Sequence, residues 1–100
     1  MTTNDILSQA ITDRIVIQFT YDGQIRIVEP FTLGYHKDSN NLVLSAYRVG
    51  GYSKSHNEPP WRLYLVDDIS NILLTEKKAE SYRSGYNSRD SRMSLIFCTC

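Results

Sequence analysis

The pattern of apolar residues is helical at the start of the chain. The apolar side chains of this segment are Ile6, Leu7, Ala10 and Ile11. Their spacing of i, i+1, i+4 and i+5 is the stripe of a short amphipathic helix. We expect this helix over about residues 3–13, with Thr3 as its N-cap, and we expect it to cover one end of a sheet.

From Ile15 the apolar period changes to two, which is the period of a β-strand. One face of this segment carries Ile15, Ile17, Phe19 and Tyr21. Asp22-Gly23 follows, and this dipeptide favours a tight hairpin turn because both residues tolerate positive φ. After the turn, Ile25 and Ile27 alternate with Arg26 and Val28. The pattern therefore predicts a β-hairpin.

A proline interrupts the second strand of this hairpin. Pro30 lacks an amide hydrogen, so we expect it to end the pairing of the strand or to lie at an edge or a bend. The strand pattern resumes with Phe31, Leu33 and Tyr35. Residues 37–40 have turn chemistry, and a third strand follows with an aliphatic inner face made of Leu42, Leu44 and Ala46.

The second half of the chain contains shorter strand-like runs. Residues 50–60 are rich in Gly, Ser, Asn and Pro, which predicts a long hairpin loop or flap. Residues 61–65 and 69–74 are divided by Asp67-Asp68 and form either one bent strand or two tightly linked ones. Residues 93–98 form a short terminal strand or helix that we expect to close the structure.

These elements predict a mainly β fold. Four or five short antiparallel strands behind an N-terminal helix favour a strongly bent sheet closed as a small barrel, because closure removes exposed strand edges. The 100 residues make one domain. Within residues 1–100 we expect the helix at about 3–13, the barrel at about 15–75 and a closing segment at about 76–100.

Charge and hydropathy narrow the classes of partner. The 11 basic and 11 acidic side chains cancel, so any site for a polyanion has to be a local patch. The N-terminal residues lack a basic segment followed by an apolar run, and no stretch is apolar enough to span a membrane. We expect a cytoplasmic protein that does not associate with membranes.

Catalytic and metal-binding patterns are absent from the sequence. Cys98 and Cys100 are too few and too close for a disulfide framework, and with His36 and His56 they lack the spacing of metal ligands. Neither histidine lies in a motif with a nucleophile, and the adjacent side chains of Asp67-Asp68 should point in different directions. We expect no catalytic residue, no metal and no cofactor, and hence a binding module and not an enzyme.

Three segments carry a more specific signal. Residues 19–34 place an aromatic strand and a turn before Arg26, Glu29, Pro30 and Leu33. Residues 42–48 and 61–69 follow in order, the first with an Ala-aromatic pair and the second with an Arg-x-aromatic-x-Val pattern and a final Asp-Asp-Ile. This order and spacing resemble the WYL family of bacterial ligand-sensing domains, and the resemblance covers most of the chain.

The resemblance implies a small five-stranded antiparallel barrel of the Sm-like or SH3-like kind. In bacterial transcription regulators such a barrel is usually attached to a winged-helix DNA-binding domain and senses a nucleic-acid fragment, a nucleotide or another anionic ligand. Two positions depart from the family: Leu42-Val43-Leu44 stands where the family has Trp-Tyr-Leu, and Asp68 stands where it has arginine. Without a winged helix, we expect this stand-alone chain not to bind operator DNA in the usual way by itself.

The candidate ligand-binding residues are basic, aromatic or hydroxyl-bearing: Arg26, Tyr47, Arg48, Ser53, Lys54, Ser55, Trp61 and Arg62. The resemblance implies that Arg26 and Arg62 form a basic ligand-facing surface, and a guanidinium suits phosphate because it donates two parallel hydrogen bonds. Residues 50–55 can present backbone amides and hydroxyls to an anion, although they lack the spacing of a P-loop.

Each candidate also has a structural alternative. The arginines can pair with a carboxylate such as Glu29 or Asp67, and the loop can be only a solvated loop. Trp61 can pack against the sheet instead of stacking on a base. The function we expect is binding of a phosphate-bearing ligand, a nucleotide or a short single-stranded nucleic acid, in a regulatory role. The alternative is a module for protein-protein interaction, with a second copy of the chain or with a separate regulator protein.

Overall fold

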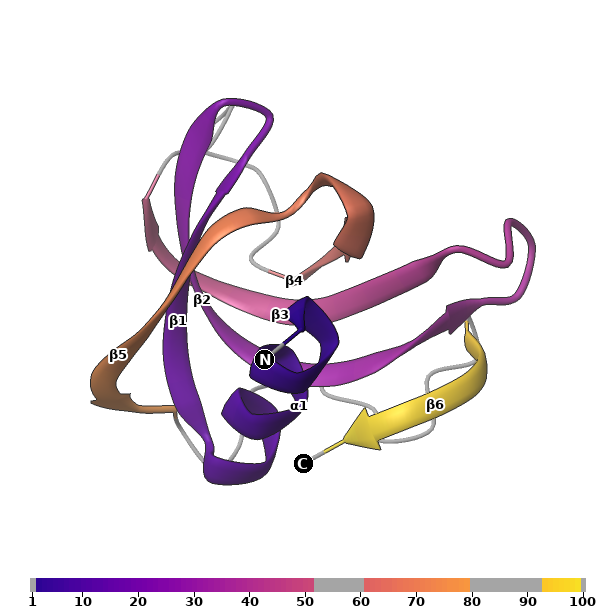
Figure 1. Ribbon diagram of the computed structural model, residues 1–100, viewed down its shortest axis with the longest axis horizontal. Coiled ribbons are helices and arrows are strands. Elements are labelled where there is room, and N and C mark those ends of the chain that lie inside the picture. Colours follow the sequence, from indigo (N-terminus) through magenta and orange to yellow (C-terminus); the bar gives the residue numbers. More distant parts are fainter. Residues whose placement is uncertain (1, 52–60, 80–92, 100) are drawn as a thin grey trace.

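A curved antiparallel sheet carries one helix across it in the computed structural model, which describes residues 2–51, 61–79 and 93–99 (Figure 1). The elements follow in the order α1 (Thr3–Asp13), β1 (Ile15–Tyr21), β2 (Gln24–His36), β3 (Leu42–Gly51), β4 (Trp61–Leu65), the 3-10 turn η1 (Val66–Asp68), β5 (Ser70–Lys78) and β6 (Met93–Thr99). The prediction of a mainly β fold with a short N-terminal helix is confirmed.

Helix α1 spans the residues that the apolar pattern predicts, but its capping residue differs. Its N-cap is Thr2 and not Thr3. The Thr2 hydroxyl accepts a hydrogen bond from the Asp5 backbone N–H at 3.1 Å, and the Asp5 carboxylate accepts one from the Thr2 N–H at 3.2 Å. This reciprocal arrangement needs an acceptor three residues after the cap, and the residue three after Thr3 is Ile6.

The predicted β1–β2 hairpin is present, and its register decides which face of β2 is buried. Asp22 and Gly23 have φ values of 54° and 76°, so a two-residue turn pairs Tyr21 with Gln24 and Phe19 with Arg26. Paired residues point to the same face of the sheet, and Phe19 faces the core. Arg26 and Val28 are therefore buried, whereas the Ile25 side chain is 50% exposed.

Pro30 neither ends β2 nor lies at an edge. It is paired with Ala46 of β3, and the register shifts immediately after it, which marks an irregularity in that ladder. On the other side of β2, pairing with β1 stops at Val28 and pairing with β6 begins at Thr32. Pro30 thus falls between two partners, where a missing amide hydrogen costs little.

The sheet does not close into a barrel, so that expectation is wrong. Its strands follow the order β4-β3-β2-β1-β5, and β6 pairs with β2 outside this path. The end strands β4 and β5 are two strands linked by the turn η1, and no pairing between them is found in the described residues. The terminal segment is a strand, but it pairs with residues 32–36 of β2 and does not join the two ends of the sheet. The 13-residue β2 extends beyond β1 and leaves that edge open for β6.

The core lies between α1 and the inner face of the sheet. Leu7, Ala10 and Ile11 of the helix pack there against Ile17, Val28, Leu44 and other buried residues from β1, β2 and β3. Two backbone hydrogen bonds of 2.8 Å hold the turn between β2 and β3: the His36 N–H donates to the Asn41 carbonyl oxygen, and the Asn40 N–H donates to the His36 carbonyl oxygen. Over the described residues, no helix has the length and apolar character needed to cross a membrane.

Candidate functional site

Two arginines and three aromatic rings meet on the inner face of the sheet near the β1–β2 turn. We call this set the arginine–tyrosine cluster; its members are Phe19, Tyr21, Arg26, Arg62 and Tyr64. Phe19 and Tyr21 belong to β1, whereas Arg62 and Tyr64 belong to β4. Two strands separate β1 from β4 in the sheet, so the curvature of the sheet brings the cluster together.

The three rings form the rigid part of the cluster. The Tyr64 ring lies 5.1 Å from the Phe19 ring and 5.0 Å from the Tyr21 ring, with interplanar angles of 81° and 89°. Edge-to-face pairs of this kind stabilise a core by about 0.5–1.5 kcal/mol beyond the area that they bury. The Tyr21 hydroxyl also accepts a hydrogen bond from the Leu65 N–H at 3.1 Å, which ties the end of β1 to the end of β4.

Arg26 is fully buried beside these rings. Its side chain has 0% of its surface exposed, and its Nη2 donates a long hydrogen bond of 3.5 Å to the Tyr21 carbonyl oxygen. The guanidinium carbon lies 5.7 Å from the centre of the Tyr21 ring, within the range of a cation–π contact. Arg26 is therefore held in place by its surroundings, and its charge contributes to the field at the nearby surface.

Arg62 connects the cluster to solvent. Its guanidinium carbon lies 5.3 Å from the Tyr21 ring centre and 5.4 Å from the Tyr64 ring centre, yet its side chain remains 27% exposed. One Nη2 atom lies 4.0 Å from a carboxylate oxygen of Asp22, in the hairpin turn. A guanidinium held between two rings, with part of its surface open, can donate hydrogen bonds to an anion in solution.

Arg48 shares this face through the register of β3. Val28 is paired with Arg48 across β2 and β3, and Ala46 is paired with Arg62 across β3 and β4. Paired residues, and residues two apart on one strand, point to the same face. Arg26, Arg48 and Arg62 therefore lie on one face of three neighbouring strands.

The predicted aromatic residues lie elsewhere. Trp61 packs against Phe31 at 5.0 Å and against Tyr47 at 5.4 Å between ring centres. We call these three residues the tryptophan cluster. Because Trp61 precedes Arg62 on β4, it points to the opposite face of the sheet. The structure therefore does not place Tyr47 and Trp61 on the face that carries the arginines. The contacts of Trp61 agree with the alternative that it packs against the sheet.

The remaining expectations divide between described and undescribed parts of the chain. Ser53, Lys54, Ser55 and His56 lie outside the described residues, so their roles stay predictions. Glu29 is buried, but strand alternation places it on the face opposite Arg26. Asp67 lies exposed in η1. Among the described residues Arg62 forms an ion pair with Asp22, which the sequence indicated only as part of a turn.

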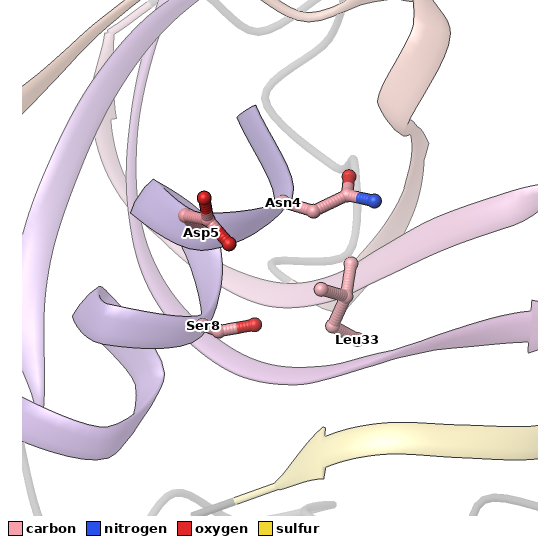
Figure 2. A pocket seen from close by; sticks show the side chains of 4 residues that line it. All are labelled: Asn4, Asp5, Ser8 and Leu33. Carbon is pink, nitrogen blue, oxygen red and sulfur yellow. The ribbon is translucent and has the colours of Figure 1, made fainter. Parts of the chain in front are cut away.

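A separate pocket of about 290 Å³ lies between α1 and β2 (Figure 2). Figure 2 shows Asn4, Asp5 and Ser8 on the helix and Leu33 on β2 around it. The Asp5 carboxylate caps the helix by accepting the Thr2 N–H. Among the described lining residues there is a carboxylate and no cation, so these residues do not favour a phosphate.

The cluster residues that sequence reasoning missed are Phe19, Tyr21 and Tyr64. A usable signal exists for Tyr21, because a two-residue Asp-Gly turn implies that Phe19 lies opposite Arg26 and that Tyr21 lies on the same face. Tyr64 is two residues from Arg62 and so shares its face. Nothing in the sequence indicates that these two strands meet.

No group of three or more His, Cys, Asp or Glu suited to a metal ion occurs in the part of the chain that the structure describes. Comparisons with protein-family models, with curated proteins and with solved structures returned no match to this chain. The assignment of the candidate site therefore depends on the chemistry of its residues and not on similarity to a known protein.

Proposed function

We propose that this chain is a WYL-like ligand-sensing module that binds a phosphate-bearing ligand, a nucleotide or a short single-stranded nucleic acid, in a regulatory role in the cytoplasm. The observation that carries the proposal is the placement of Arg26, Arg48 and Arg62 on one face of β2, β3 and β4. In a chain whose charges cancel overall, the partly exposed guanidinium groups of Arg48 and Arg62, with the buried Arg26 on the same face, make the local basic patch that a polyanion requires.

The three arginines would divide the work of binding. Arg62 is partly exposed and held between two tyrosine rings, so it can meet a phosphate without first being ordered. Arg48 is half-buried on the same face and supplies a second set of donors. Arg26 is buried, so it contributes charge and position and not direct contact.

The arrangement of the strands supports an Sm-like or SH3-like assignment as part of the proposal. An N-terminal helix precedes five strands in the order β4-β3-β2-β1-β5, and a 3-10 turn links β4 to β5. A short N-terminal helix and five antiparallel strands are features that the family resemblance leads us to expect, although here the two end strands are not paired within the described residues. The WYL-like assignment itself depends on the resemblance of the sequence segments.

A titration of the purified protein with nucleotides and labelled single-stranded oligonucleotides tests the proposal. We expect Arg62→Ala and Arg48→Ala each to weaken binding at least about tenfold, because each removes charge-assisted hydrogen bonds to phosphate. We also expect the affinity to fall steeply as salt rises, since phosphate contacts release counterions. The absence of binding to every phosphate-bearing probe would refute the proposal.

Lys37→Ala is the matched control for charge. Lys37 is exposed in the turn between β2 and β3, so this substitution removes one positive charge away from the arginine face. An equal loss of affinity in Lys37→Ala and Arg62→Ala would mean that only net charge matters. The single tryptophan supplies a second control, because Trp61 points to the other face and its emission should stay unchanged on binding. Strong quenching would instead indicate stacking on Trp61.

A protein-interaction module is the second candidate function, and strand β5 favours it. Leu73 and Leu74 on this edge strand are 59% and 41% exposed. In the described residues β5 pairs with β1 alone, so its other edge can add a strand from a second copy of the chain. A mass that rises with protein concentration, and that returns to the monomer value in Leu73→Lys, would support this function.

A further inference from the structure

Asp22 lies beside the partly exposed side chain of Arg62. It occupies the first position of the β1–β2 turn with a φ of 54°, and its side chain is 53% exposed. Its Oδ2 lies 4.0 Å from Nη2 of Arg62. That separation is too long for a hydrogen bond, so the contact is a loose ion pair of the kind that contributes little to stability.

Both partners of this ion pair are held in position by other contacts. The Arg62 guanidinium lies against the rings of Tyr21 and Tyr64 at 5.3 Å and 5.4 Å. Asp22 belongs to a two-residue turn whose flanking residues are paired in the sheet. The Asp22 carboxylate is thus held beside the Arg62 guanidinium at a high effective concentration. Because the Asp22 side chain is exposed, it can still rotate away from Arg62.

We propose that Asp22 is a specificity-determining residue, a tethered carboxylate that competes with the ligand for Arg62. The inference rests on the proposed function and deepens it. A ligand carboxylate has the same charge as Asp22 and gains little by replacing it. A phosphate or pyrophosphate group carries more charge and more acceptor oxygens, so it displaces Asp22 and engages the guanidinium fork. The site therefore selects phosphate-bearing anions over carboxylates.

Asp22→Asn is the decisive variant because it removes the charge and keeps the turn. Asparagine tolerates positive φ, and Asn-Gly is a preferred two-residue hairpin sequence. The probes are inorganic pyrophosphate and malonate, titrated at about 0.1 M salt, where charges more than about 10 Å apart are largely screened. Asp38→Asn, in the exposed turn at the other end of β2, is the control with the same change in charge.

We expect Asp22→Asn to bind pyrophosphate about two- to fivefold more tightly than the parent chain, in line with the loss of an exposed ion pair. The affinity for malonate should increase by a larger factor, so the ratio of pyrophosphate affinity to malonate affinity should fall in Asp22→Asn. In the Arg62→Ala background, Asp22→Asn should change neither affinity, because the competition acts through Arg62.

Four results would overturn the inference, and the last of them would also overturn the proposed function. Asp22→Asn and Asp38→Asn can have equal effects, which would reduce the role of Asp22 to net charge. The gain can persist in the Arg62→Ala background, which would show that Asp22 does not act through Arg62. The parent chain can bind pyrophosphate through Arg62 while Asp22→Asn leaves the affinity unchanged, and then the proposed function stands without a role for Asp22. If no variant binds pyrophosphate or an oligonucleotide, both proposals fail together.

Discussion

The arginine–tyrosine cluster and the tryptophan cluster use the same strand for opposite purposes. Trp61 and Arg62 are neighbours on β4, yet Trp61 packs against Phe31 and Tyr47 while Arg62 lies against Tyr21 and Tyr64. The tryptophan cluster contains only aromatic rings, whereas the arginine–tyrosine cluster also contains two guanidinium groups. The difference teaches that an arginine next to a tryptophan in a strand sequence does not share a site with it, because the sheet lies between their side chains.

The largest expected effect is a difference in unfolding free energy between a substitution in the arginine–tyrosine cluster and one in the tryptophan cluster. Tyr64 is fully buried between two rings, so Tyr64→Ala should cost about 4 kcal/mol of unfolding free energy. Trp61 is only half-buried, so Trp61→Ala should cost no more than about 2 kcal/mol. Urea unfolding followed by circular dichroism measures both variants. A greater loss of unfolding free energy in Trp61→Ala would show that the tryptophan cluster contributes more to stability than the arginine–tyrosine cluster, contrary to this prediction.

The next effect separates the two arginines within one cluster. Arg26→Ala should cost about 3 kcal/mol, because it empties a fully buried position and removes the donor to the Tyr21 carbonyl. Arg62→Ala should cost about 1 kcal/mol, because its ring contacts are partly exposed. The same unfolding experiment compares them. Equal losses would mean that Arg62 is as structural as Arg26 and would weaken its role in binding.

A pair of adjacent glycines tests the backbone beside Arg26. Gly51 is paired with Arg26, has a φ of 81°, and would place a Cβ 2.5 Å from the Ile25 carbonyl oxygen. Gly51→Ala should therefore cost about 2 kcal/mol. At Gly50 the new Cβ would meet Ile27 at an ordinary 3.5 Å, so Gly50→Ala is the matched control and should cost less than about 1 kcal/mol. Similar melting temperatures for the two variants would contradict this difference.

The smallest expected effect concerns one hydroxyl group. Tyr21→Phe keeps the ring contacts of the arginine–tyrosine cluster and removes the acceptor for the Leu65 N–H. The loss should be about 1 kcal/mol, with faster amide exchange at Leu65. Unchanged exchange at Leu65 would show that this hydrogen bond does not hold β4 against β1.

Much of the local structure was predictable from short-range chemistry. The helix follows from the spacing of its apolar residues, and the Asp22-Gly23 turn follows from two residues that tolerate positive φ. The N-cap was missed because apolar spacing does not reveal the reciprocal hydrogen bonds of Thr2 and Asp5. Barrel closure was wrong because the end strands β4 and β5 do not pair in the described residues, and β6 pairs with the part of β2 that extends beyond β1.

The candidate site was only partly predictable. Arg26 and Arg62 were named from their strand positions and from the family resemblance, and the structure brings both to the Tyr21 ring. The aromatic partners differ from the predicted ones, because the choice of Tyr47 and Trp61 considered residue type without the face on which each lies. Asp22 was missed as a functional residue because its contact with Arg62 spans 40 positions of the chain.

The sequence by itself determined the helix, the hairpin turn, the alternation along each strand and the cancellation of charge, because these depend on residues that are close together in the chain. Only the tertiary structure decided that β1 and β4 meet across the curved sheet, that Arg26 is buried and Arg62 partly open, and that Asp22 lies beside Arg62. The physical reason is that such contacts depend on register and curvature, which sum small local twists over many residues before two distant side chains meet.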